Sequence, residues 1–146
     1  MTEENKTNTA TGELGVVIYT PDGIKTDTQA EHVVVPAEEG DFMILPGHCG
    51  LVANLRTGIL EVHGPDGVRY YSIHGGSFSV EGDKVRISTF ATEDAENLDI
   101  ERARRAKQHA EAILASEAEE HIIAEARAAL YRAIIRLEAY ELVDHS

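Results

Sequence analysis

The sequence predicts an α+β protein in which an N-terminal antiparallel β-sandwich precedes a C-terminal antiparallel hairpin of two helices. All twelve glycines and all four prolines lie at or before Gly82. Short β-branched runs separated by turn residues fill residues 14–90, which is typical of a sandwich or flattened barrel. Residues 91–146 are instead dominated by Ala, Glu, Arg, Ile and Leu, the composition of long helices.

Turn signals divide the first part into strands. Residues 21–23 and 65–67 are both Pro-Asp-Gly, and residues 81–83 are Glu-Gly-Asp, which are hairpin signals. Val85 and Ile87 alternate with polar residues and therefore share one face of a strand. The eight runs that we predict as strands are Leu14–Thr20, Ile24–Val35, Asp41–Leu45, Leu51–Leu55, Ile59–His63, Val68–His74, Ser77–Val80 and Lys84–Phe90.

Two helices are predicted in the second part. Asn97 or Asp99 can cap the first, which runs to about residue 115, and Ser116 with Glu119 forms a capping box for the second. We therefore divide the chain into a disordered tail (1–13), a β-sandwich domain (14–92) and a helical hairpin domain (93–146).

The two predicted helices carry alanine-rich seams. Each seam has a 3–4 spacing, so the helices can pack closely as an antiparallel pair. The seams consist of Ala103, Ala106, Ala110 and Ile113 on the first helix and Ile122, Ala126, Ala129 and Ala133 on the second. Alanine seams bury little area, about 1 kcal/mol or less per residue, so a folded hairpin and an opened arm are expected to differ by only a few kcal/mol.

Composition excludes several classes of function. Thirteen Lys and Arg against 26 Asp and Glu give a formal net charge of −13, which argues against a nucleic-acid partner. No apolar run approaches the roughly 20 residues of a membrane helix, and the N-terminus resembles neither a secretory signal nor a transit peptide. The single cysteine, Cys49, excludes an internal disulfide and fits a reducing compartment. These features predict a soluble, cytosolic protein.

The chemistry-bearing residues do not form a catalytic or metal-binding pattern. The seven histidines are scattered, and neither His48 nor His63 belongs to the His-x-His pair that a metal site in a β-barrel would need. Cys49 is adjacent to His48, but neighbouring residues on a strand point to opposite faces. We therefore expect no active site and no metal.

Charged residues at the open end of the hairpin form the candidate site. Folding the hairpin about residue 117 places position 102 opposite 132 and position 99 opposite 135–136. Asp99, Arg102, Arg132 and Arg136 then converge next to the sandwich, and guanidinium groups match phosphate oxygens. The alternative is an Asp99–Arg136 salt bridge with the other arginines solvated.

Four motifs resemble the epsilon subunit of rotary (F-type) ATP synthases. They appear in the family's order and span roughly residues 14–142. Met43 and Gly50 depart from the usual glycine and proline of the first motif. The motifs are Gly40–His48 with Leu51 and Thr57-Gly58, Gly75–Val80, Leu98–Ala103 and Ala129–Leu137.

The resemblance implies a non-catalytic subunit of the central stalk. Its sandwich would bind the gamma subunit and the ring of c subunits, which couples the catalytic head to proton (or sodium-ion) flow. Its helices would extend toward the alpha and beta subunits transiently and oppose ATP hydrolysis. The resemblance also implies a peripheral location on the cytoplasmic side of the bacterial inner membrane, without direct membrane insertion.

The same resemblance implies roles for individual residues. Asp41 and His48 match positions near the rotor-facing end of the sandwich, where the c-ring is contacted. Glu93, Asp99, Arg102, Arg132 and Arg136 match a set that contacts ATP, a regulatory ligand in some members; no cofactor is required. The alternative function is a stand-alone sandwich and hairpin that senses a nucleotide or another anion.

Overall fold

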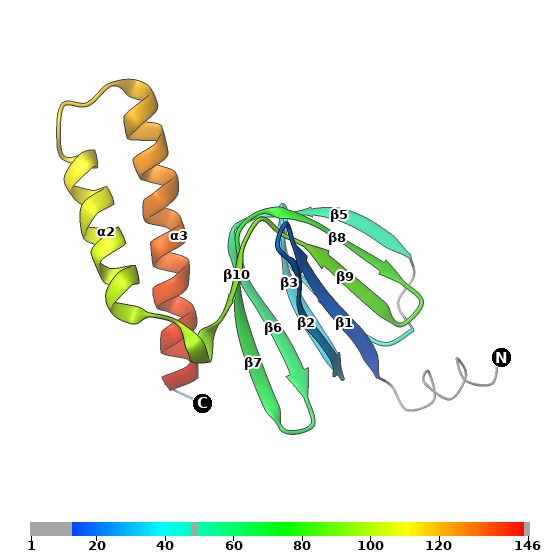
Figure 1. Cartoon of the computed structure of the whole chain (residues 1–146). Helices are drawn as coiled ribbons and strands as arrows, with labels where there is room; N and C mark the ends of the chain where they lie inside the picture. Colours follow the sequence, from blue (N-terminus) through cyan, green and yellow to red (C-terminus); the bar gives the residue numbers. More distant parts are fainter. Residues whose placement is uncertain (1–12, 48–49, 145–146) are drawn as a thin grey trace.

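The computed structural model describes residues 13–47 and 50–144 and consists of a β-sandwich with a two-helix hairpin at its side (Figure 1). This confirms the predicted fold class. The predicted tail, apart from Glu13, lies outside the described residues, as do His48 and Cys49. None of the described helices is long and apolar enough to cross a membrane.

Within residues 13–47 and 50–144, ten strands form one continuous sheet that folds over on itself. Eight strands are predicted, and the two extra ones arise because the predicted run 24–35 divides at Glu31 and because a short strand follows residue 91. The strands are β1 (Leu14–Thr20), β2 (Gly23–Ala30), β3 (His32–Ala37), β4 (Gly40–Ile44), β5 (Leu51–Leu55), β6 (Gly58–Gly64), β7 (Gly67–Ile73), β8 (Gly76–Glu81), β9 (Lys84–Ser88) and β10 (Thr92–Asp94).

The sheet is not wholly antiparallel. Its order is β10-β7-β6-β3-β5-β8-β9-β1-β2, with β4 paired to β3. Strands β1 and β9 pair in parallel, with Val16 opposite Val85 and Ile18 opposite Ile87. The other pairings among the described strands are antiparallel, as in the predicted sandwich, and the chain between β1 and β9 runs through other strands rather than through a crossover helix.

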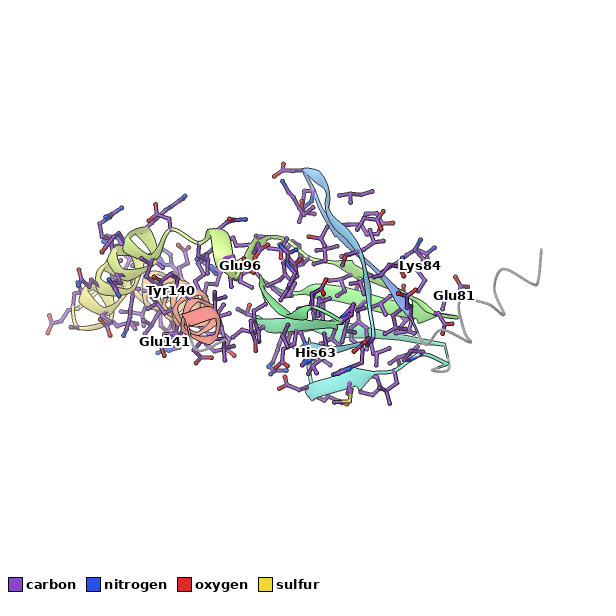
Figure 2. The ribbon with its side chains drawn as sticks, turned by 90° about the horizontal axis from the view of Figure 1, so that it is seen from below. His63, Glu81, Lys84, Glu96, Tyr140 and Glu141 are labelled. Carbon is purple, nitrogen blue, oxygen red and sulfur yellow. The ribbon has the colours of Figure 1, made fainter. Side chains whose placement is uncertain are left out.

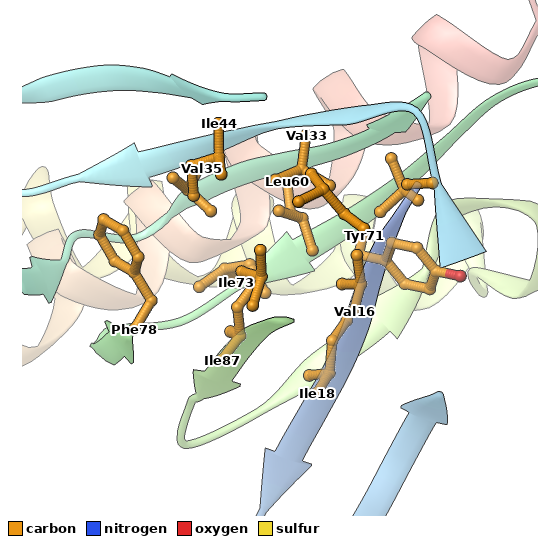
Figure 3. Packing of buried hydrophobic residues seen from close by; sticks show 14 of the residues in the cluster. Val16, Ile18, Val33, Val35, Ile44, Leu60, Tyr71, Ile73, Phe78 and Ile87 are labelled. Atoms are coloured by element: carbon orange, nitrogen blue, oxygen red, sulfur yellow. The ribbon is translucent and has the colours of Figure 1, made fainter. Parts of the chain in front are cut away.

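The core lies between the two halves of this folded sheet (Figure 3). Alternation along β1 places Val16 and Ile18 inside, and Val85 and Ile87 of β9 point the same way. Phe78 fills one end of the core, where its ring centroid lies 6.4 Å from that of Phe42. Each fully buried aliphatic side chain contributes about 1.5–3 kcal/mol to folding.

Glycines are required at particular turns and crossings. Gly23 and Gly67, the last residues of the two Pro-Asp-Gly signals, have φ values of +118° and +131°, which disfavour residues with a Cβ atom. At Gly76 the φ is +113°, and an added Cβ would lie 1.9 Å from the carbonyl oxygen of Ser88. Only glycine therefore allows β8 to begin this close to the end of β9.

A single turn of 3₁₀ helix, η1 (Ala95–Asn97), follows β10 and leads into the hairpin. The hairpin consists of α2 (Ile100–Leu114) and α3 (Glu120–Asp144). Asp99 caps α2, because its carboxylate accepts a hydrogen bond from the Arg102 backbone N–H at 3.1 Å. The predicted capping box at Ser116 is wrong: its hydroxyl donates to the Ile113 carbonyl at 2.6 Å. Ser116 thus terminates α2, and the Glu119 carbonyl accepts the first bonds of α3.

Helix α3 lies between α2 and the sandwich (Figure 1). The buried alanines Ala103 and Ala110 of α2 belong to the predicted seam, whereas Ala106 is exposed. On α3, Ala126 and Ala133 are buried. Ile135 and Ala139 are also buried, on the side of α3 that faces away from α2. This side packs on β6, β7 and η1, whereas α2 packs mainly on α3. The hairpin is therefore attached to the sandwich through α3.

Candidate functional site

Glu93 on β10 is the central residue where the sandwich meets the hairpin. Its Oε1 atom accepts hydrogen bonds from the Arg136 Nε of α3 at 2.7 Å and from the Ser72 hydroxyl of β7 at 2.9 Å. The Glu93 backbone N–H in turn donates to the Ser72 oxygen at 3.1 Å. One carboxylate therefore joins two strands and a helix.

The environment of Glu93 keeps its carboxylate ionised. Burial alone would raise the pKa of Glu93, but the His74 imidazole, the Arg136 guanidinium and the Ser72 hydroxyl together lower that pKa to about 2, from an ordinary value of 4.5. The His74 Nε2 lies 3.5 Å from Oε1, too far for a well-formed hydrogen bond. The shorter contacts of Arg136 and Ser72 are therefore the stronger local restraints on the carboxylate.

His74 is an unusual neighbour, because its side chain is only 5 % exposed and neither ring nitrogen has a hydrogen-bond partner among the described residues. Its backbone N–H donates to the Thr89 hydroxyl at 3.1 Å. Sequence reasoning missed Ser72 and His74. Their alternation on one strand could have indicated a shared face, but the pattern does not show which polar residues are buried.

The end of β10, next to Glu93, is held by further contacts of Asp94. Asp94 forms a 2.5 Å ion pair with Arg69 of β7 and caps η1 by accepting from the Glu96 backbone N–H at 3.0 Å. Figure 2, which views the molecule from below, shows Glu96 between the sandwich and the hairpin. The sheet therefore extends to Asp94, two residues beyond the predicted boundary at residue 92.

The predicted arginines have different environments. Arg136 is partly buried against Glu93, whereas Arg102 and Arg132 are exposed and make no ion pair within the described residues. The Asp99–Arg136 salt bridge that sequence analysis left as an alternative is not formed in this part of the chain, because Asp99 caps α2 and Arg136 contacts Glu93.

Helix geometry places the three arginines on one side of the hairpin. Arg102 precedes buried Ala103, and Arg132 precedes buried Ala133, by one position each. In two antiparallel helices whose seams face each other, residues that precede a seam residue by one position point to the same side of the pair. Arg136 follows Ala133 by three positions, which is about 60° from the seam in the same direction as Arg132, so it lies on that side as well. We call Arg102, Arg132 and Arg136 the guanidinium flank. Three cations on one flank can bind an anion with several oxygens.

A hollow of about 450 Å³ lies between α2 and α3 and involves none of the predicted site residues. It is lined by Ile100, Arg104, Leu137 and Tyr140, among others. Arg104 is two positions after Arg102, about 200° around the helix, so this hollow lies away from the guanidinium flank. Among the described residues, no group of three His, Cys, Asp or Glu side chains is arranged to hold a metal ion.

The predicted rotor-contact residues are only partly described. Asp41, at the beginning of β4, forms a 2.6 Å ion pair with Arg56, and its side chain is 62 % exposed. His48 lies outside the described residues, beyond the other end of β4. The structure therefore gives a local environment for Asp41 alone.

Two family models match the chain in consecutive order. Residues 13–96 match the β-sandwich domain of the ATP synthase delta/epsilon chain, and residues 96–141 match its long α-helix domain. The chain belongs to the ATP synthase delta/epsilon family. The resemblance inferred from the four motifs is thereby confirmed, and the junction between the models lies within η1.

Curated relatives match this family member over nearly their whole length. An ATP synthase epsilon chain from Bacillus velezensis is 41 % identical over 123 residues, which cover 84 % of this chain and 93 % of the relative. An epsilon chain from Symbiobacterium thermophilum is 37 % identical over 135 residues, which cover 91 % of this chain and 96 % of the relative.

Solved structures agree with this family assignment. A chain in the Euglena gracilis mitochondrial ATP synthase (OSCP/F1/c-ring) superimposes with a TM-score of 0.65 at 26 % identity and covers 91 % of this chain and 80 % of that one. A chain from the Tetrahymena thermophila mitochondrial ATP synthase central stalk and c-ring has a TM-score of 0.60 at 14 % identity. The match covers 87 % of this chain and 96 % of that one. The latter shows the fold alone.

The low pKa of Glu93 predicts a specific pH dependence. A carboxyl whose folded pKa lies below its unfolded pKa stabilises the protein fully above the unfolded value, here 4.5, and this contribution disappears as pH falls toward 2. We expect the free energy of unfolding of wild type to exceed that of Glu93→Gln by about 1 kcal/mol at pH 6. The difference is no larger because solvent screens a carboxylate that is 38 % exposed. Urea unfolding of both proteins from pH 6 to pH 3 measures it. A difference that does not shrink on acidification would contradict the assignment.

Proposed function

We propose that this chain is a central-stalk subunit of a proton-translocating ATP synthase, without an active site of its own. The observation that carries the proposal is the consecutive match of the sandwich and helical family models over residues 13–141. The sandwich docks on the gamma subunit and the c-ring, and the hairpin opposes ATP hydrolysis, with transient contacts to the alpha and beta subunits. The complex places the chain peripherally on the cytoplasmic side of the inner membrane.

Exposed apolar side chains on the sandwich support a docking role. Val52 and Phe90 are 78 % and 75 % exposed, and Ile24, Met43 and Leu45 are also more than half exposed. Exposed large apolar side chains that lie together mark protein–protein interfaces. Asp41 and His48 remain the proposed c-ring contacts, and Asp41 offers a solvent-accessible carboxylate for a cationic partner group.

The attachment of the hairpin suits a movable arm. Helix α3 contacts the sandwich through a charged contact at Glu93 and a small apolar set that includes Ile135 and Ala139. Charged groups regain hydration when they separate, so such a contact opens at lower cost than an extensive apolar interface. A docked hairpin and an opened arm can therefore both be populated.

The guanidinium flank supports ATP as a regulatory ligand. Arg102 and Arg132 provide guanidinium groups with no ion-pair partner among the described residues, and Arg136 lies beside them. These arginines can bind phosphate oxygens, while Glu93 and Asp99 complete the proposed nucleotide-contacting set. ATP bound there contacts α2 and α3 together, so it would favour the docked hairpin.

The stalk assignment predicts capture of gamma. We expect the full chain to retain a coexpressed gamma subunit in a pull-down at physiological salt, and a chain truncated after Asn97 to retain it as well, because the truncation keeps β10 and η1. A folded, monomeric chain that fails to retain gamma would instead favour the stand-alone anion sensor.

Nucleotide binding predicts ligand-dependent stabilisation. We expect millimolar ATP to raise the melting temperature of the wild-type chain, and the double variant Arg132→Ala, Arg136→Ala to lose that rise because two phosphate-binding groups are removed. Arg127→Ala, an exposed change elsewhere on α3, should leave the response intact. An undiminished rise in the double variant would show that the guanidinium flank does not bind ATP.

An inhibitory hairpin predicts faster hydrolysis when it is removed. We expect ATP synthase assembled with the chain truncated after Asn97 to hydrolyse ATP faster than the complex with the full chain, measured under identical nucleotide conditions. Equal rates in two complexes of equal subunit content would reject inhibition by the hairpin while leaving the docking role in place.

A further inference from the structure

His74 is a buried imidazole beside the carboxylate that joins the sandwich to the hairpin. It directly follows the last residue of β7, its side chain is 5 % exposed, and neither ring nitrogen has a hydrogen-bond partner among the described residues. Such groups are rare in folded proteins, because burial removes their hydrogen bonds to water. An imidazole in this position is available to a neighbouring group whenever the contacts of that group change.

The group within reach of His74 is the Glu93 carboxylate. The His74 Nε2 lies 3.5 Å from the Glu93 Oε1, which is too long for a well-formed hydrogen bond but within the distance of an ion pair. The same oxygen already accepts hydrogen bonds from the Arg136 Nε at 2.7 Å and from the Ser72 hydroxyl at 2.9 Å. While the hairpin is docked, Arg136 therefore supplies the cation that Glu93 needs.

The other titratable groups on the elements around His74 are paired with each other or reach solvent. Glu93 and Arg136 are therefore the charges that decide whether His74 carries a proton. The other groups are the ion pair Asp94–Arg69 between β10 and β7, the ion pair Arg56–Asp41 at the connection that precedes β6, and, on α3, Arg132 and Tyr140, one helical turn to either side of Arg136.

Docking of α3 opposes the uptake of a proton by His74. With α3 docked, Arg136 already neutralises Glu93, and a protonated His74 would be a second cation beside it in an almost completely buried position. With α3 released, Arg136 departs, and a partly buried carboxylate again needs a cation. A proton taken from solvent by His74 provides that cation, so the released state binds this proton more tightly than the docked state does.

We propose that His74 is an alternative cation for Glu93, which makes release of the hairpin depend on protons. Arg136 neutralises Glu93 in the docked state, and protonated His74 replaces it in the released state. A ligand shifts an equilibrium toward the state that it binds more tightly, so acidification favours the opened arm. The role of that arm in a complex rests on the proposed function, whereas the exchange of partners at Glu93 is a property of the isolated chain.

Amide hydrogen exchange of the isolated full-length chain tests this role of His74. Exchange rates of α3 amides, divided by the intrinsic rate at each pH, report the population in which the hairpin is released. We expect that population to rise about threefold to tenfold in wild type from pH 8 to pH 5.5, a range in which histidine side chains generally gain their charge. In His74→Gln the same ratio should fall to about one, because glutamine takes up no proton in this range.

Two controls separate hairpin release from other effects of pH. His109→Gln removes an exposed imidazole from α2 and should leave the wild-type ratio intact. Amides of β1 in the same samples report global unfolding, so a change confined to α3 shows release of the hairpin. His74→Asn repeats the measurement with a smaller side chain and serves in place of His74→Gln if that variant does not fold.

Three results would overturn the proposal. They are a pH ratio that is unchanged in the folded His74 variant, a wild-type ratio of about one, and α3 exchange that slows on acidification relative to the intrinsic rate. Because the readout uses the isolated chain, loss of the proposed inhibition of hydrolysis would not affect this result.

Discussion

The ionised carboxylate of Glu93 is the constraint on which the arrangement of sandwich and hairpin depends. It is partly buried on β10, and a charge in that position needs a cation and hydrogen-bond donors. Ser72 donates from within the sheet, but the cation, Arg136, comes from α3. Separating the helix leaves the charge to be rehydrated. Local electrostatics at the last strand therefore determine where the hairpin docks.

Apolar packing acts differently in the two parts of the molecule. Within the sandwich, large residues such as Phe78 and Ile87 are almost completely buried, and their burial favours a single permanent arrangement. Between α3 and the sandwich, the buried apolar side chains include Ile135 and Ala139. The Glu93–Arg136 contact therefore determines much of the position at which α3 docks. A permanent body and a releasable arm thus follow from where the chain places its large aliphatic residues.

The sequence predicts the sandwich and hairpin because turn residues and alternation are local signals, as at Gly23 and Gly67. It does not predict the break between β2 and β3 at Glu31, because strand character continues through it, nor β10, which contains only Thr, Glu and Asp. The parallel pairing of β1 with β9 is a long-range contact. Helical spacing is regular enough to place Arg136 near the junction, whereas the burial of Ser72 and His74 depends on the folded sheet.

Cations are scarce in this chain, so the arginines near the junction between sandwich and hairpin are informative. The chain has 26 acidic residues against 13 basic ones. Among the described residues, five arginines pair with a carboxylate: Arg56, Arg69, Arg86, Arg104 and Arg136. Arg136 pairs with Glu93 of the sandwich and so joins α3 to β10, while Arg102 and Arg132 make no ion pair within the described residues. Arg136 therefore fastens the hairpin to the sandwich, whereas Arg102 and Arg132 can bind an anion on the same helices. An anion bound there would add contacts that exist only when the helices remain together, so fastening and ligand binding would reinforce each other.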